Sequence, residues 1–202
     1  MKEILRTLEV QRWDDHRYYH HSRINQSLHF VSALSFLVSY VLLFSDPVAA
    51  ALVAWLVAMT TRQIGHYVFE PKGYDHVNQA THEHKEDIKV GYNLRRKTVL
   101  ISLWAAVPLV LWVSPAALAA LAERTGETGL VRNVGWVWLV LGAGGLVFRT
   151  VHLFFLQDVR TGLVWMLKIL TDPFHDLKLY CRAPLHLMRG ELIDPMGQVH
   201  RR

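Results

Sequence analysis

The sequence predicts an all-α integral membrane protein with about four transmembrane helices, an amphipathic interfacial helix in its C-terminal part, and both termini in the cytoplasm. Of the 202 residues, 51% are hydrophobic and only 19% are charged. The apolar residues also form continuous blocks, at 30–44, 48–59 and 99–113, that contain no lysine, arginine or glutamate. Such blocks suit a lipid solvent, because helices on the surface of a soluble protein alternate polar and apolar faces. We therefore interpret residues 1–202 as a single membrane domain.

The chain is predicted to begin with a cytoplasmic arm, residues 1–26, which leads into a helical hairpin at residues 27–69. The arm is rich in charged residues and has no small-residue cleavage site, so it does not resemble a signal peptide. Each half of the hairpin approaches the roughly 20 residues that cross the hydrocarbon core of a bilayer. The dipeptide Asp46-Pro47 should form the tight turn between the two halves.

A histidine-rich cytoplasmic loop, residues 70–97, is predicted to connect the hairpin to a second helical pair at 98–156. This pair consists of spans at about 98–121 and 134–156. The remaining residues, 157–202, form an interfacial tail. Its first part places leucine and methionine residues at helical spacing among charged residues, which is typical of an amphipathic helix on a membrane surface.

Basic residues are concentrated on one side of the predicted spans. All but two of the 22 lysines and arginines fall in the arm, the loop, the tail or the adjoining ends of the spans, and the exceptions are Arg124 and Arg132. By the positive-inside rule, both termini and the loop are cytoplasmic. The net charge of +5 therefore reflects topology, and we expect membrane lipids rather than nucleic acid as partners. The composition, rich in alanine and arginine, favours a bacterial inner membrane over the endoplasmic reticulum. The sequence leaves the oligomeric state open, and an oligomer is possible.

The twelve histidines follow the same one-sided distribution, in cytoplasmic segments or at the cytoplasmic ends of spans. His29, His66 and His152 lie at similar depth inside spans, where ionisable groups are costly and by default face a functional site. For any one of them alone, a structural histidine held by hydrogen bonds is as good an explanation. Three at one level, next to a histidine-rich loop, favour a metal site.

Local spacing supports a metal site. Two sets of residues recur at intervals of four, so that each set shares one helix face: His21, Asn25 and His29 on the first span, and Arg62, His66 and Glu70 on the second. The hairpin would then bring His29, His66 and Glu70 together. Imidazoles with a carboxylate and open coordination positions suit Fe(II), which binds and activates molecular oxygen, and zinc fits the same ligands.

The loop contributes His82 and His84, in a segment dense in potential ligands. It is not the zinc-protease pattern, because no second histidine follows at the required helical offset. The pair would complete a metal shell, cover the site or simply be solvated.

Two segments, YHHSRINQSLH at 19–29 and QIGHYVFE at 63–70, resemble the membrane-bound 2-hydroxy fatty acid dioxygenase family. The resemblance covers roughly residues 16–70. It implies Fe(II)-dependent oxidation of a 2-hydroxy acyl chain, which shortens the chain by one carbon in fatty acid α-oxidation. The residues that carry over are His20, Asn25, His29, His66 and Glu70.

This sequence departs from the family pattern in two places. Pro71 leads into the long insertion 72–97, where the family has a proline-containing stretch soon after the glutamate. The family motif also selects His20, whereas continuous helix geometry selects His21, because nine residues would put His20 and His29 on opposite faces. A break in the helix before Asn25 would place His20 correctly, so both histidines remain candidates.

We therefore expect a membrane-embedded, histidine-ligated non-haem iron oxygenase that acts on a fatty acyl or 2-hydroxy fatty acid substrate. Fe(II) would be held by His29, His66 and some of the other candidates, which are His20, His21, His82, His84 and His152. Asn25, Arg62 and Glu70 would complete the site. Glu70 would bind the metal or orient His66, and Arg62 or Arg149 would hold the substrate carboxylate.

Three other functions remain open from the sequence. A di-iron fatty acid hydroxylase or desaturase is suggested by HRYYHH at 16–21, although such enzymes need several histidine boxes. A haem-binding electron carrier would use His29 and His66 as axial ligands. In a non-catalytic membrane protein, the histidines would be interfacial and the basic loop would bind anionic lipid headgroups.

Overall fold

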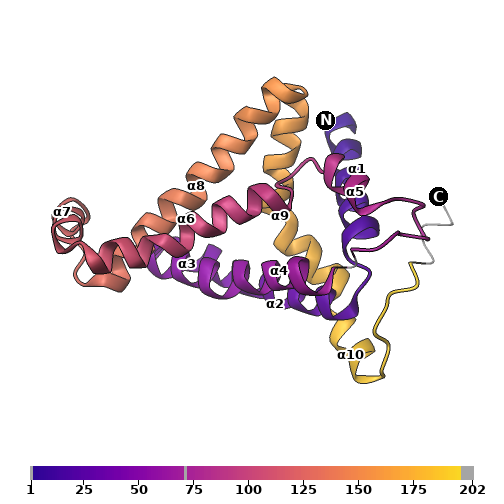
Figure 1. The fold of residues 1–202 in the computed structure, drawn as a ribbon, viewed down its shortest axis with the longest axis horizontal. Coiled ribbons are helices and arrows are strands. Elements are labelled where there is room, and N and C mark those ends of the chain that lie inside the picture. Colours follow the sequence, from indigo (N-terminus) through magenta and orange to yellow (C-terminus); the bar gives the residue numbers. More distant parts are fainter. Residues whose placement is uncertain (1, 71, 197–202) are drawn as a thin grey trace.

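The computed structural model describes residues 2–70 and 72–196, and in these ranges it contains helices and no strand (Figure 1). The predicted all-α fold class is confirmed. Residues 71 and 197–202 of the predicted loop and tail, with Pro71 and His200, lie outside the described residues.

The helices follow one another in this order: α1 (Lys2–Tyr19), α2 (Arg23–Leu42), α3 (Pro47–Val53), η1 (Ala54–Met59), α4 (Thr60–Ile64), η2 (Gly65–Phe69), α5 (His82–Asp87), α6 (Leu94–Val113), α7 (Pro115–Thr125), α8 (Leu130–Leu156), α9 (Val159–Tyr180) and α10 (Ala183–Met188). The segments α3, η1, α4 and η2 form one continuous helix, in which η1 and η2 are π-helical turns. We call this continuous helix the π-containing helix.

Three helices are long and apolar enough to cross a membrane: the π-containing helix (Pro47–Phe69), α6 and α8. The sequence predicted about four spans. The predicted span that is missing from these three is the first one, the first half of the hairpin. It corresponds to α2, whose buried face carries Asn25, Gln26 and His29. These polar residues lower the mean hydropathy of α2, although its length of 20 residues would suffice to cross a bilayer.

The predicted span at 98–121 is wrong at its end, because the chain forms two helices there. Helix α6 ends at Val113, and Ser114 leaves the helical conformation with φ −122° and ψ 84°. The reason is Pro115, which disfavours the helical conformation in the residue before it and fits the first turn of a new helix. The Ser114 side chain caps α7 by accepting a hydrogen bond from the Ala117 backbone N–H.

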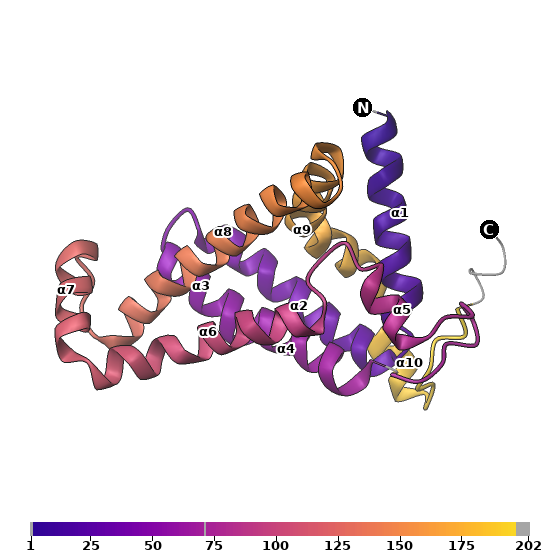
Figure 2. The same ribbon diagram turned by 45° about the horizontal axis from the view of Figure 1, so that its top comes forward.

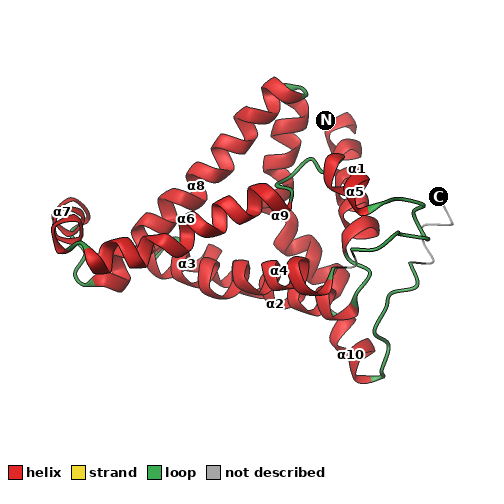
Figure 3. Cartoon of the chain, viewed as in Figure 1, coloured by secondary structure: helices red, strands yellow, loops and turns green. Residues whose placement is uncertain are grey.

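Helix α2 and the π-containing helix form the predicted helical hairpin, and Asp46 caps the second half by accepting a hydrogen bond from the Ala49 N–H. Figures 1 and 2 show α7 at one end of the bundle and α1 at the other. Helix α9 packs against α2, α8 and α1 at the end of the bundle where α1 lies. Figure 3 shows that the long loops also gather at this end. We call it the α1 end.

Three tryptophans join the three candidate spans in the interior. Trp104 of α6 lies between Trp55 and Trp138, with ring centroids 6.0 Å and 5.2 Å apart and nearly parallel planes. The indole N–H groups of Trp55 and Trp138 donate to the backbone carbonyls of Trp138 and Trp104. This tryptophan stack fixes the positions of the spans relative to one another.

Candidate metal centre

Helix α1 ends at Tyr19 and α2 begins at Arg23, and the non-helical residues between them determine where the His20 side chain lies. Ser22 adopts an extended conformation and caps α2, with its Oγ 3.3 Å from the Asn25 N–H. Two amide groups from the first turn of α2 then hold the break: Asn25 Nδ2 donates to the Tyr19 carbonyl at 2.9 Å, and Gln26 Nε2 donates to the His20 carbonyl at 2.8 Å. The break before Asn25 that would select His20 is therefore present.

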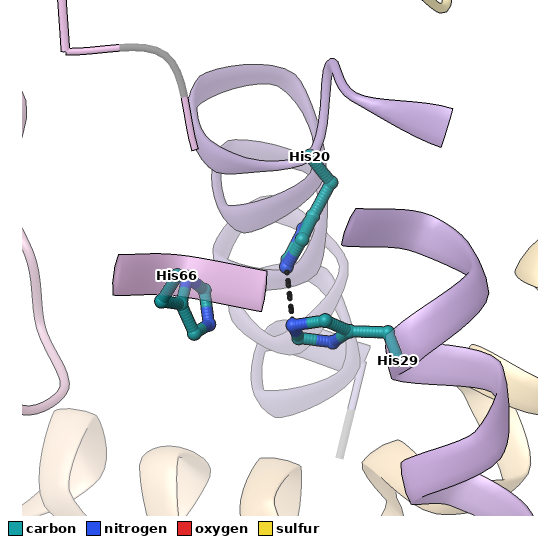
Figure 4. Close-up of side chains that lie close together, drawn as sticks. All are labelled: His20, His29 and His66. Carbon is teal, nitrogen blue, oxygen red and sulfur yellow. Dashed lines mark hydrogen bonds between the residues drawn. The ribbon is translucent and has the colours of Figure 1, made fainter. Parts of the chain in front are cut away.

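His20, His29 and His66 meet in the interior at the α1 end (Figure 4). One ring nitrogen from each lies within 4.8 Å of the others, and the Nε2 atoms of His20 and His29 are 3.2 Å apart. All three side chains are buried, and His29 is fully buried. We call these residues the histidine cluster. They come from the α1–α2 break, α2 and η2, so that three separate elements converge on one point.

His66 reaches the cluster from a π-helical turn. Such turns are rare and often occur at functional sites, because the wider turn changes the direction of a side chain. Gly65 makes the approach to α2 possible. A Cβ atom on Gly65 would lie 2.1 Å from Asn25 Oδ1 and 3.6 Å from His29 Cδ2, so no larger residue fits unless Asn25 moves.

Carboxylates face the outer nitrogens of two cluster histidines. Glu70 Oε2 lies 2.7 Å from His66 Nδ1, and Asp176 Oδ2 lies 3.5 Å from His29 Nδ1. A carboxylate at Nδ1 favours the tautomer in which Nδ1 carries the proton and Nε2 is free to bind a metal. His20 Nδ1 is buried and has no hydrogen-bond partner among the described residues.

The surroundings keep His20 neutral. Burial, together with the nearby His29, lowers the pKa of His20 well below its ordinary value, so its ring is unprotonated at neutral pH. Burial also raises the pKa of Glu70, while Lys89 and Lys97 act in the opposite direction. Metal binding requires a neutral imidazole, and burial keeps His20 in this neutral form in the metal-free protein.

Tyr180 of α9 packs against the cluster on another side. Its ring centroid lies 5.5 Å from that of His20 and 6.0 Å from that of His29, and its hydroxyl is 3.2 Å from His16 Nδ1. Burial raises the pKa of Tyr180, so the hydroxyl stays protonated and available as a donor.

An ion-pair network that includes residues of α9 reaches the cluster through Asp176. Asp176 also binds Arg62, whose Nη1 is 3.1 Å away. Asp172 lies 3.2 Å from Arg12 Nε and 2.9 Å from Lys168 Nζ. The sequence interpretation missed these α9 residues. Their signal was a polar stripe at intervals of four on the predicted interfacial helix, made of Lys168, Asp172, Asp176 and Tyr180, all of them buried.

The cluster suits a divalent metal ion. Metal–nitrogen distances of about 2.0–2.1 Å put two imidazole nitrogens of one ion roughly 3.0–3.4 Å apart, and the observed Nε2–Nε2 distance of 3.2 Å falls in this range. Neutral rings, carboxylates behind two of them and an unpartnered buried nitrogen on the third all agree with this assignment. The ligand set fits both Fe(II) and zinc.

The other histidines predicted as ligands lie outside the cluster. The Nε2 atom of His21 lies 3.5 Å from Asp75 Oδ2. His82 and His84 are on α5, where His84 is exposed. His152 pairs with Arg149 on α8 at 3.1 Å. His21 is turned away because the chain is not helical at 20–21, and α5 and α8 direct their histidines elsewhere.

Two of the three predicted non-histidine site residues do not touch a cluster nitrogen. Asn25 holds the α1–α2 break through the Tyr19 carbonyl, and Arg62 is engaged by Asp176 and Asp172. Glu70 is the third, and it orients His66.

The geometry does not favour the two other metal hypotheses. The rings of His29 and His66 are in edge-to-face contact, with centroids 4.9 Å apart, which leaves no layer between them for a porphyrin. A di-iron centre needs a second group of ligands, and among the described residues the only such group of histidine, cysteine and carboxylate side chains is this cluster.

The fold and the site together define a helical protein with three candidate spans and a buried three-histidine cluster at one end. Comparison with protein-family models, curated proteins and solved structures finds no match to this chain.

Proposed function

We propose that the protein is a membrane-embedded non-haem iron oxygenase that acts on a fatty acyl substrate, specifically a 2-hydroxy fatty acid. The observation that carries the proposal is the buried convergence of His20, His29 and His66, with Glu70 and Asp176 behind two of the rings. The resemblance of 19–29 and 63–70 to the dioxygenase family supports the choice of substrate. Three histidines leave coordination positions open on an ion that prefers more than three ligands.

The overall reaction balances without a further co-reactant. A 2-hydroxy acid and one molecule of oxygen give an acid that is one carbon shorter, carbon dioxide and water. When bound, Fe(II) supplies the activation of molecular oxygen. The protein's own residues hold the cluster in place: Glu70 and Asp176 fix the protons on His66 and His29, and the surrounding helices exclude bulk water.

A lipid substrate is consistent with the position of the cluster. It lies at the end of the candidate spans where the basic arm, loop and tail gather, which the positive-inside rule assigns to the cytoplasmic face. A fatty acid in a bacterial inner membrane would reach this depth with its chain between the helices and its carboxylate near the surface.

The direct test is metal analysis and turnover of the full-length protein purified in detergent. Reconstitution under anaerobic conditions with Fe(II) should give about one iron per chain and convert 2-hydroxypalmitate to pentadecanoate when oxygen is admitted. His20→Ala, His29→Ala and His66→Ala should each abolish turnover and lower iron content at least about tenfold. His186→Ala is the matched control, because His186 is paired with Glu191 away from the cluster.

Asp176→Asn tests whether the α9 carboxylate positions His29. It should weaken metal affinity by about 10- to 100-fold, because the outer partner of a ligating histidine sets its orientation and basicity. Iron content that is unaffected by all three histidine substitutions would contradict the proposal. So would stoichiometric zinc without oxygen consumption.

A further inference from the structure

A cavity of about 210 Å³ lies between the π-containing helix and α6. Met59, Gln63 and Tyr67 line it from the first helix, and Ile101 and Trp104 line it from the second. We call it the interhelical groove. Its walls are almost entirely apolar, and it ends against the tryptophan stack through Trp55 and Trp104.

The groove runs toward the histidine cluster. Gln63 and Tyr67 flank His66 along the same helix, one turn before it and one residue after it. The Tyr67 hydroxyl joins the two helices at this end, 3.2 Å from the Leu94 carbonyl and 2.9 Å from Thr98 Oγ1. A molecule lying in the groove would therefore have one end close to the turn that carries His66.

Lys97 provides a basic side chain at the same end. Lys97, Ile101 and Trp104 are spaced by four and three residues, so they share one face of α6, and the last two line the groove. The nearest carboxyl group that interacts electrostatically with Lys97 is that of Glu70, which already faces His66 Nδ1. Within residues 2–70 and 72–196, the Lys97 side chain nevertheless has no ion pair or hydrogen bond.

The other cations near the cluster are already engaged. Arg62 binds Asp176, and Arg149 donates to the carbonyls of Val90 and Gly91 at 2.6 Å and 3.1 Å. Lys89 lies 3.3 Å from Glu86. The two arginines expected from the sequence to hold a substrate carboxylate are thus occupied, and Lys97 is available.

We propose that the interhelical groove binds the acyl chain of a fatty acid and that Lys97 pairs with its carboxylate. One basic side chain without a hydrogen-bonded partner, at the end of one apolar groove, matches a single-chain acid, because a carboxylate next to Lys97 would favour the charged form of the amine. The inference rests on the proposed function only in assigning the histidine cluster as the reaction site, because binding itself needs no metal.

The test measures palmitate binding to the full-length, metal-free protein in detergent, by displacement of a fluorescent fatty acid. Lys97→Met should weaken palmitate binding about tenfold or more, because a hydrogen bond to a charged group is lost. Binding of methyl palmitate, which has no charge, should not change. Lys97→Arg should retain palmitate binding, and Arg96→Met, which alters an exposed residue next to Lys97, should have no effect.

Ile101→Trp tests the groove itself. It fills the apolar space and should weaken palmitate and methyl palmitate equally. A palmitate probe with a diazirine at its methyl end should cross-link to the π-containing helix or α6. Equal palmitate binding by Lys97→Met and the unaltered protein would overturn the inference, as would cross-links confined to other helices. Displacement of the probe by phosphatidylglycerol vesicles at equal lipid concentration would also overturn it, since the groove would then be a phospholipid site.

Metal content of the same preparations separates this inference from the proposed function. If palmitate binds as expected but no metal does, the oxygenase proposal fails and the groove stands. If metal binds to the cluster while Lys97→Met and Ile101→Trp leave palmitate binding unchanged, the groove assignment fails and the metal centre stands.

Discussion

The tryptophan stack and the histidine cluster are two buried regions of one bundle, and they are stabilised in different ways. In the stack, Trp55 and Trp138 pack face to face with Trp104 and donate their N–H groups to backbone carbonyls. In the cluster, His20 Nδ1 and Glu70 Oε1 are buried without a hydrogen-bond partner among the described residues. The stack also leaves one such group, Trp104 Nε1, so the two regions differ in chemistry rather than in the presence of unpartnered atoms. The cluster buries three imidazoles beside carboxylates, an arrangement that a metal ion can occupy.

One helix serves both regions. The π-containing helix contributes Trp55 from η1 and His66 from η2, so each region depends on a π-helical turn of the same element. The stack holds the three spans together, and the cluster depends on the helix positions that the stack sets. Changes in the stack should therefore alter stability without altering the affinity of the folded protein for metal, and changes around the cluster should alter both.

The largest expected effect on stability comes from Trp138→Ala. Trp138 is 4% exposed and stacks on Trp104, so truncation should lower the free energy of unfolding by about 3–5 kcal/mol through lost packing. Trp112→Ala is the matched control, because Trp112 is 71% exposed on the outside of α6 and should cost little. Thermal unfolding in detergent measures the stability of each variant, and metal titration of the folded fraction measures its affinity for metal. A Trp138→Ala protein that is stable but binds metal weakly would show that the two regions are not separable.

The α1 end should also be the acid-sensitive part of the molecule. Burial lowers the pKa of His16 from its ordinary value of 6.5 to about 4, so the folded state keeps this ring neutral while the unfolded chain takes up a proton. The stabilisation is therefore fully present above pH 6.5 and is lost as the pH falls from 6.5 to 4. At about 1.4 kcal/mol per pH unit, the loss amounts to about 3 kcal/mol at most.

Thermal unfolding of metal-free protein across this pH range checks the effect. His16→Asn keeps an amide near Tyr180, removes the titrating ring and should flatten the pH dependence. Part of the dependence should remain in this variant, because the pKa of His20 is lowered in the same direction. An unchanged profile would mean that His16 does not titrate on unfolding.

Much of the site followed from the sequence, because its signals are local. Intervals of four placed His29 on one helix and His66 with Glu70 on the next, and the Asp46-Pro47 turn paired the two helices. The choice between His20 and His21 could not be made in this way. It depends on the hydrogen bonds of Asn25 and Gln26 to carbonyls six residues earlier, and a regular helix contains no such bonds.

The contribution of α9 could not be predicted because it depends on tertiary packing. Asp176 lies 147 residues from His29 and 114 from Arg62 in the chain, and nothing local relates them. The fold shows the same division. The three candidate spans are apparent from composition. The break at Ser114-Pro115 is also encoded locally, but it lies within a long apolar run that suggests one continuous helix.

The smallest expected effect tests how closely the two hairpin helices must approach. Gly65→Ala places a Cβ against Asn25 Oδ1, which must move and in doing so weakens its bond to the Tyr19 carbonyl. We expect a loss of about 1–3 kcal/mol in unfolding free energy and weaker metal binding, because His20 is held by that break. Gly144→Ala on α8 meets nothing within 4 Å and should stabilise the protein by about 0.5–1 kcal/mol, since alanine favours the helix. Both glycines are helical, so the difference between the two variants isolates the contact with Asn25. If Gly65→Ala matched Gly144→Ala in stability and metal affinity, the close approach of η2 to α2 would not be what positions the cluster.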